Sequence, residues 1–120
     1  MKTLLITLLF LLSCETDNET ITGHWAGSMI IGLKEIPIEF YLNQSGNNLS
    51  GYFMSGLGSR NIELNSESNY LDQQINLIAI DTVYQMKYIF SGVVNCDKIT
   101  GTYTMGVSEN IYTNSFEIQK

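Results

Sequence analysis

The stretch ITGHW at residues 21–25 decides the fold, because its pattern returns along the chain. LSGYF at residues 49–53 and ITGTY at residues 99–103 repeat the order aliphatic, hydroxyl, glycine, any residue, aromatic. A looser copy, FSGVV, occupies residues 90–94. In a strand, the first, third and fifth residues of each copy point to one face. This face carries the apolar side chains, so we expect it to be buried.

The repeat also places a glycine on the buried face of each strand, at Gly23, Gly51 and Gly101. An inward glycine removes a side chain where a strand coils tightly and leaves room for a neighbouring aromatic ring. The repeat therefore predicts the bends of a strongly coiled sheet, with Trp25 as the large inward residue of the first strand. It does not indicate a catalytic signature.

The rest of the chain from residue 21 shows the same period-two alternation between short segments rich in Gly, Asn and Ser. This pattern predicts eight strands, which begin near residues 21, 35, 48, 60, 71, 83, 98 and 111. Evenly spaced short strands without an intervening helical pattern are typical of an all-β sandwich or barrel. Because the connections are short, we predict an antiparallel up-and-down meander that closes into an eight-stranded barrel.

Length and charge limit the classes of function. The 120 residues favour one domain, which is large enough to bury a core without disulfides. The net charge of −6 and the lack of a basic stripe argue against a nucleic-acid partner.

The N-terminal sequence MKTLLITLLFLLSC, residues 1–14, predicts a targeting segment. Lys2 precedes an apolar run that is too short for a membrane-spanning helix but fits a secretory signal. LLSC at residues 11–14 resembles the lipobox of bacterial lipoproteins. This resemblance implies cleavage before Cys14, lipidation of its thiol and anchoring to a membrane, and it leaves Cys96 without a partner.

The predicted organisation is a signal peptide at residues 1–13, a lipidated Cys14 with an acidic flexible tether over residues 14–20, and a barrel at residues 21–120. The residue after Cys14 is Glu15 rather than Asp, so the inner-membrane retention signal of proteobacterial lipoproteins is absent. We therefore expect a lipid-anchored protein of the bacterial cell envelope, at the outer membrane.

The residues that would carry catalysis are scarce. His24, the only histidine, lies on the face opposite Trp25 and is expected to point outward. One histidine without clustered carboxylates favours neither a metal site nor a Ser–His–Asp triad. Glu35, Glu39 and Glu63 fall at solvent-side positions or near turns. The sequence thus predicts no enzyme, no metal and no cofactor.

Inward aromatic residues are the candidate ligand contacts. Apolar and flat ligands favour such linings, but a small barrel also fills its interior with the same residues, so pocket and packed core both remain open. Arg60 shares strand parity with Ile62 and Leu64, and it would either pack on Trp25, meet a ligand carboxylate or face solvent. The aromatic residues of inward parity are Phe40, Phe53, Tyr84, Tyr88, Phe90 and Tyr103.

ITGHW near the start of the first strand resembles the Gly-x-Trp signature of the calycin superfamily, which contains lipocalins, fatty-acid-binding proteins and avidins. LSGY at residues 49–52 and ITGTY at residues 99–103 resemble the matching glycine strands of avidins. The resemblance implies a barrel with a ligand cup at one end. Two departures stand out: Gly27 and Ile31 replace the Asn and Ser that avidins place after this Trp, so biotin is not expected. Nor does an Arg of the last strand pack on Trp25, as in lipocalins, since the chain ends Ile118-Gln119-Lys120.

Two functions follow from this interpretation. The first is non-catalytic capture of a small hydrophobic or aromatic ligand, which predicts a void under Phe40, Tyr88 and Tyr103. The second is a protein-binding or protease-inhibitor-like barrel, which predicts a filled core and an exposed apolar patch on loops such as Met54–Ser59 or Met105–Tyr112.

Overall fold

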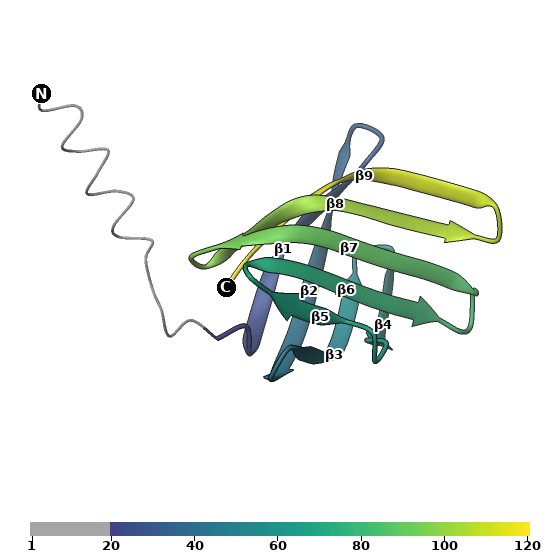
Figure 1. Cartoon of the computed structure of the whole chain (residues 1–120). Coiled ribbons are helices and arrows are strands. Elements are labelled where there is room, and N and C mark those ends of the chain that lie inside the picture. Colours follow the sequence, from purple (N-terminus) through teal and green to yellow (C-terminus); the bar gives the residue numbers. More distant parts are fainter. Residues whose placement is uncertain (1–19) are drawn as a thin grey trace, which may run out of the picture.

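The computed structural model describes residues 20–120, which form one antiparallel β-structure (Figure 1). Within this range no helix occurs, so the predicted all-β class is confirmed. The strands are β1 (Gly23–Ile31), β2 (Lys34–Ser45), β3 (Asn48–Ser55), β4 (Gly58–Glu63), β5 (Asn69–Leu71), β6 (Gln74–Asp81), β7 (Met86–Asn95), β8 (Lys98–Val107) and β9 (Asn110–Gln119).

The sheet closes on itself through strands that follow one another in the sequence. β1 pairs with β2, β2 with β3, β3 with β5, and each strand from β5 to β9 with the next. β9 returns to pair with β1, joining Ala26–Met29 to Phe116–Gln119. The predicted eight-stranded, antiparallel up-and-down barrel is therefore confirmed, and it is compatible with a calycin-like fold.

Nine strands fill the eight positions because β4 and β5 share one of them. Both pair with β3, β4 through Gly58–Glu63 and the three-residue β5 through Asn69 alone. The polar stretch before Asn69 hid this short strand from sequence analysis. The strand predicted from residue 71 begins at Gln74, and the strand predicted from residue 83 begins at Met86.

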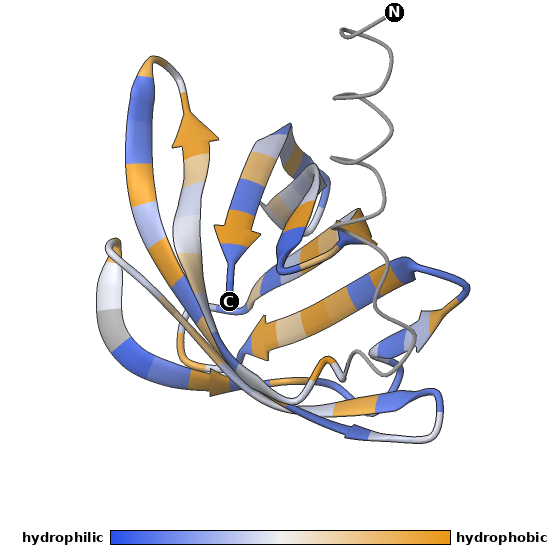
Figure 2. Cartoon of the chain, turned by 90° about the vertical axis from the view of Figure 1, so that its left-hand side faces the viewer, coloured by the Kyte–Doolittle hydropathy of each residue, from blue (hydrophilic) through white to orange (hydrophobic). Residues whose placement is uncertain are grey.

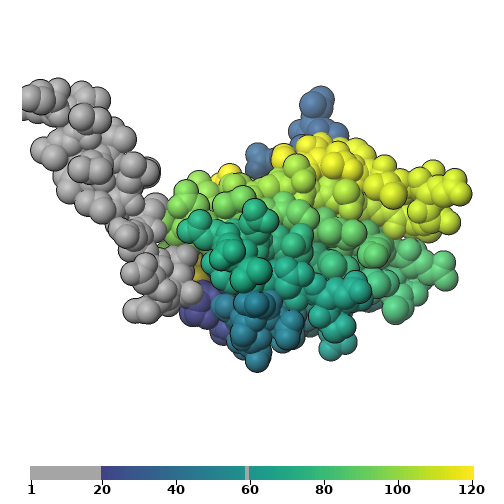
Figure 3. All heavy atoms as spheres, in the orientation of Figure 1, coloured from purple at the N-terminus to yellow at the C-terminus, as the bar shows by residue number. Residues whose placement is uncertain are grey.

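The two ends of the barrel differ. We call one the mouth end: it carries the turns at residues 32–33, 56–57, 82–85 and 108–109. The β6–β7 and β8–β9 hairpins project at this end, on the right of Figures 1 and 3. The other end, which we call the closed end, carries the remaining hairpin turns and both Thr20 and Lys120.

The strand faces alternate as the sequence predicts. Figure 2 shows hydrophobic and hydrophilic residues in turn along the strands. In each glycine repeat the first and fifth residues are buried and the hydroxyl residue is exposed, as for Ile21, Trp25 and Thr22. Burial of these alternating apolar side chains supplies the main driving force for folding. The largest fully buried side chains are Trp25, Tyr103, Phe40, Phe53 and Phe90.

Two of the three inward glycines, Gly51 and Gly101, allow the backbones of neighbouring strands to approach closely, and a β-carbon on either would meet backbone atoms first rather than an aromatic ring. A β-carbon on Gly51 would overlap the carbonyl oxygen of Tyr41 on β2, and one on Gly101 would overlap that of Ser91 on β7. Gly51 also has φ +126°, in a region that favours glycine. The predicted role in tight coiling therefore has a specific cause, which is the close approach of adjacent backbones.

Trp25 anchors the closed end. Its Nε1 donates a hydrogen bond to the carbonyl oxygen of Ile21 at 2.9 Å, which folds residues 21–22 against the core. The ammonium of Lys120 lies 5.7 Å from the centroid of a Trp25 ring and donates to the carbonyl oxygen of Thr20 at 2.7 Å. The cation that lies over Trp25 is therefore Lys120. Arg60, which the sequence offered for this role, lies over Tyr84 instead.

The predicted signal peptide, Cys14 and nearly all of the tether lie outside the described residues. Cys96 lies in the β7–β8 turn with φ 61°. It is disulfide-bonded, so the expectation that it has no partner is wrong. Cys14 is the only other cysteine of the sequence.

Candidate functional site

A half-open hollow of about 470 Å³ lies at the mouth end, where β4, β6 and β7 meet. Its lining includes the apolar or aromatic side chains of Leu57, Met86 and Tyr88. It also includes a charged pair, Arg60 and Asp81. Aromatic and aliphatic surface around a few polar groups is the usual chemistry of a small-molecule site. We call this space the mouth hollow.

The charged pair spans a gap between two strands. The two strands are β4 and β6, and the pairing between the β4 region and β6 is limited to the bridge from Leu64 to Ala79. Beyond it, Nη2 of Arg60 donates to Oδ2 of Asp81 at 2.5 Å. A side-chain ion pair therefore continues the connection where the backbone ladder stops.

Asp81 is held by its own turn as well as by Arg60. Its Oδ1 accepts hydrogen bonds from the backbone N–H groups of Val83 and Tyr84, at 3.0 and 3.4 Å. The hydrogen bond from Arg60 is the main reason that the pKa of the Asp81 carboxyl lies below its usual range, with the two N–H groups adding to it. Asp81 is accordingly a fixed anion at neutral pH.

Tyr84 does not take the inward position predicted for it. It belongs to the turn at residues 82–85 and is 69% exposed. The alternation of β7 starts only at Met86, so strand parity does not extend to Tyr84. Its ring instead lies 5.3 Å from the guanidinium carbon of Arg60, at the rim of the mouth hollow.

Tyr88 forms the floor of the mouth hollow. Its side chain is buried, and its ring contacts Phe53 with centroids 5.0 Å apart. Burial is the main cause that raises the pKa of its hydroxyl, which therefore remains protonated at neutral pH. Tyr88 can thus offer both a ring face and a hydrogen-bond donor.

The other four predicted aromatic contacts lie deeper and are packed. Phe40 and Phe53 stack at 5.0 Å, and Phe90 lies 5.0 Å from Phe40 and 5.5 Å from Tyr103. All four are fully buried. Contacting rings thus pack around Phe40 and Tyr103, in the region where the sequence predicts a void under Phe40, Tyr88 and Tyr103.

Tyr103 has a structural partner at the mouth end. Its hydroxyl donates to the carbonyl oxygen of Ile30 at 2.5 Å, and burial raises its pKa to about 12. Tyr112 acts in a similar way on the same hairpin, since its hydroxyl accepts from the N–H of Gly32 at 2.8 Å. These two tyrosines tie the β1–β2 hairpin to β8 and β9.

The remaining candidates for chemistry lie on the outer surface. His24 points outward as predicted, stacks on Tyr41 with centroids 4.5 Å apart and contacts Glu39 at 2.7 Å. Glu35 and Glu63 are exposed. Within residues 20–120, no three His, Cys, Asp or Glu side chains lie together as a metal site would require.

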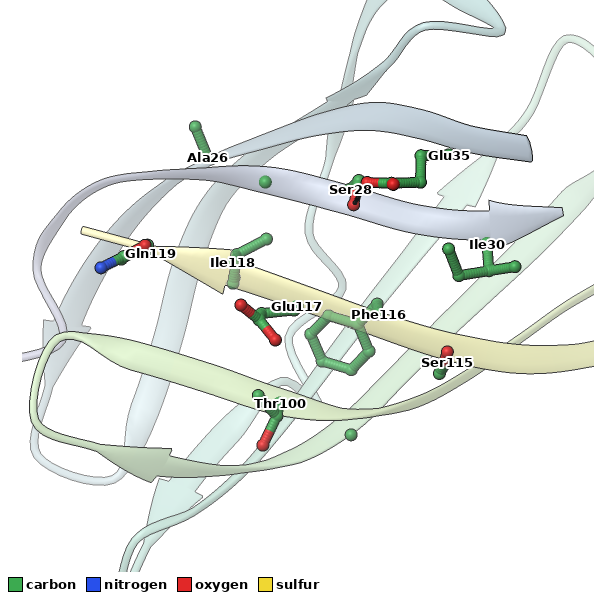
Figure 4. Close-up of a pocket in the computed structure, with 12 residues that line it drawn as sticks. Ala26, Ser28, Ile30, Glu35, Thr100, Ser115, Phe116, Glu117, Ile118 and Gln119 are labelled. Carbon is green, nitrogen blue, oxygen red and sulfur yellow. Dashed lines mark hydrogen bonds between the residues drawn. The ribbon is translucent and has the colours of Figure 1, made fainter. Parts of the chain in front are cut away.

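A second hollow of about 470 Å³ lies on the outside of the barrel, where β1 separates from β9 (Figure 4). Glu35 and Glu117 contribute carboxylates to it, and Ser28 and Ser115 contribute hydroxyls. We call this space the β1–β9 hollow. Its polar lining residues Ser28, Glu35, Ser115 and Glu117 were not predicted as contacts, because strand parity assigns them to the solvent face.

Large apolar side chains gather on the turns of the mouth end. Leu33, in the β1–β2 turn, is fully exposed, and Leu57, in the β3–β4 turn, is 55% exposed. Val83 and Ile111 are each 66% exposed on the other two hairpins. Four separate turns thus present apolar groups at one end of the molecule.

Comparisons of the chain with protein-family models, with curated proteins and with solved structures find no match. In the part of the chain that the structure describes, no helix has the length and apolar character to cross a membrane.

Proposed function

We propose that this protein is a non-catalytic binding barrel of calycin-like type that holds a small hydrophobic or aromatic ligand in the mouth hollow. The observation that carries the proposal is the convergence of Arg60, Tyr84 and Tyr88 on one hollow. The ligand would lie nearer to the mouth end than the sequence suggests, between the packed rings and solvent rather than among the rings. Arg60 at the rim favours a ligand that combines a flat apolar body with an anionic group.

Binding of 1-anilinonaphthalene-8-sulfonate to residues 20–120 tests this proposal, because that probe has a flat aromatic body and one sulfonate. We expect a single saturable site, with the dissociation constant raised about tenfold by Tyr84→Ala and by Arg60→Gln. Tyr52→Ala is the matched control, since Tyr52 stacks with Tyr41 on the outer face. Equal affinity in all four proteins would contradict the proposal.

A protein partner is the second candidate, and two observations favour it. The barrel core is filled by contacting rings, and apolar side chains are exposed on the mouth-end turns. Such exposed apolar groups are a common feature of interaction surfaces. A partner protein would use Leu33, Val83 and Ile111, none of which lines the mouth hollow, whereas a small ligand would use that hollow. Probe binding that survives polar substitution of these three residues therefore separates the two.

We further propose that the protein is exported and anchored to the bacterial envelope through lipid on Cys14, at the outer membrane. The lipobox resemblance of residues 11–14 supports this, and Glu15 is consistent with the outer membrane. The lipid on Cys14 would replace the disulfide at Cys96, because Cys14 is the only other cysteine of the sequence. Two acyl chains or more would hold the barrel at the membrane surface.

A further inference from the structure

The barrel seam between β1 and β9 is only partly paired. Pairing runs from Gln119 to Phe116 on β9 and from Ala26 to Met29 on β1. β9 continues from Phe116 to Asn110 without a strand neighbour on that side among residues 20–120. One end of β9 is therefore an exposed sheet edge.

The turn geometry shows which backbone groups face this edge. Ser108 and Glu109 form a two-residue turn, and Val107 pairs with Asn110 across it. In such a hairpin the flanking pair is hydrogen-bonded, and hydrogen-bonded pairs alternate along the ladder. The N–H and C=O groups of Asn110, Tyr112 and Asn114 therefore bond to β8, and those of Ile111 and Thr113 face outward.

A side-chain hydrogen bond next to this segment agrees with this assignment. The N–H of Ser115 donates to Oδ1 of Asn114 at 2.8 Å, and so it also points away from β8. No backbone bond within residues 20–120 engages Ile111 or Thr113 on the free side. Their four main-chain groups can bond to an added strand.

This edge lacks the usual protection against added strands. Exposed edges are commonly blocked by charged residues, proline or bulges. The segment Asn110–Phe116 contains no charged residue and no proline. Ile111 and Val107 lie near the tip of the β8–β9 hairpin and expose apolar side chains beside the edge.

The charge beside the edge indicates what kind of segment would bind. The β1–β9 hollow adjoins the end of the free edge at Ser115, and its lining contains the carboxylates of Glu35 and Glu117 and no cation (Figure 4). Lys98 contacts Glu117 at 3.5 Å, but both side chains are about half exposed, so this ion pair is weak. A basic side chain of another molecule can therefore replace Lys98 beside Glu117. A second copy of the chain, with its own charge of −6, would be repelled, whereas a basic segment would be attracted.

We propose that the free edge of β9 at Ile111–Thr113 binds an extended peptide segment by strand addition, with basic side chains of that segment placed against Glu35 and Glu117. Main-chain hydrogen bonds supply affinity in this mode, and the side chains select the sequence. The site is separate from the mouth hollow and does not depend on the function proposed for it.

Binding of blocked eight-residue peptides, measured by calorimetry on residues 20–120, tests the proposal. The probe alternates threonine and valine and carries a lysine at each end, and its matched control carries glutamates there. An added strand uses only alternate N–H groups of the peptide. We expect N-methylation of one alternate set to raise the dissociation constant at least tenfold, and methylation of the other set to change it less than twofold.

Substitutions in the protein give a second measurement. Thr113→Pro removes an edge N–H that no barrel bond uses, and we expect at least a tenfold loss of affinity, with Thr113→Val as the control. Glu35→Gln together with Glu117→Gln should reduce the preference for the lysine peptide to less than threefold. Failure of every peptide to bind, or equal effects of both methylated sets, would overturn the proposal. A dimer that Thr113→Pro dissociates would also overturn it, because it would place a second copy on the edge.

Discussion

At the scale of single residues, Gly51 makes the sharpest prediction about stability. Gly51→Ala would bring a β-carbon into the carbonyl oxygen of Tyr41 at a φ of +126°, so both the contact and the backbone conformation oppose it. We expect the free energy of unfolding to fall by about 3 kcal/mol, as measured by urea denaturation. Gly58→Ala is the control, because a β-carbon there meets nothing within 4 Å, and its effect should stay within about 0.5 kcal/mol. Similar losses from the two variants would contradict this account of the glycine repeat.

The residue scale also shows what strand parity can predict. Parity placed Trp25, Phe40 and Tyr103 inside the barrel because an alternating strand has one buried face, and all three are buried. It failed at Tyr84, since the turn before β7 is longer than its composition suggests. Parity cannot tell a packed ring from a pocket wall, because both need the same inward aromatic residue.

At the scale of elements, the strands with clear alternation were predictable. The barrel position beside β3 that β4 and β5 share was not. β5 pairs with β3 through one residue, Asn69, and its short polar sequence carries no periodic signal. The mouth hollow lies beyond the Leu64–Ala79 bridge, where β4 and β6 are no longer paired. The meeting of Arg60 and Asp81 is a tertiary contact between residues 21 apart, which no local pattern indicates.

The ion pair that joins β4 to β6 predicts a pH dependence. A carboxyl whose pKa is lowered by folding stabilises the native state above its unfolded pKa and loses that effect as the pH falls through the lowered value. Asp81 is such a group, because the hydrogen bond from Arg60 lowers its pKa in the folded protein. We therefore expect Asp81→Asn to lower the urea midpoint at pH 5–7, and the difference from the unsubstituted protein to shrink below about pH 4. Asp97→Asn, at the closed end, is the control, and a difference independent of pH would show that the charge on Asp81 does not matter.

At the scale of the whole molecule, the filled interior limits where function can reside. Rings in contact occupy the middle of the barrel, and Trp25 with Lys120 covers the closed end. We therefore place the proposed binding at the mouth end and at the incomplete seam between β1 and β9. Residue 20 lies at the closed end, so the proposed lipid anchor on Cys14 would leave the mouth end facing away from the membrane.

The modification of Cys14 decides whether this arrangement holds for the whole protein. A thioether-linked lipid uses the thiol of Cys14, so it is chemically incompatible with a disulfide between Cys14 and Cys96. We expect the full chain, expressed in a bacterium with lipoprotein processing, to lose residues 1–13, to gain the mass of two or three acyl chains and to partition into detergent. Cys14→Ser should keep the barrel folded and remain in the aqueous phase. An unreduced, unacylated chain whose mass increases by two hydrogens on reduction would contradict lipid anchoring, because it would show that Cys14 is committed to the bond with Cys96.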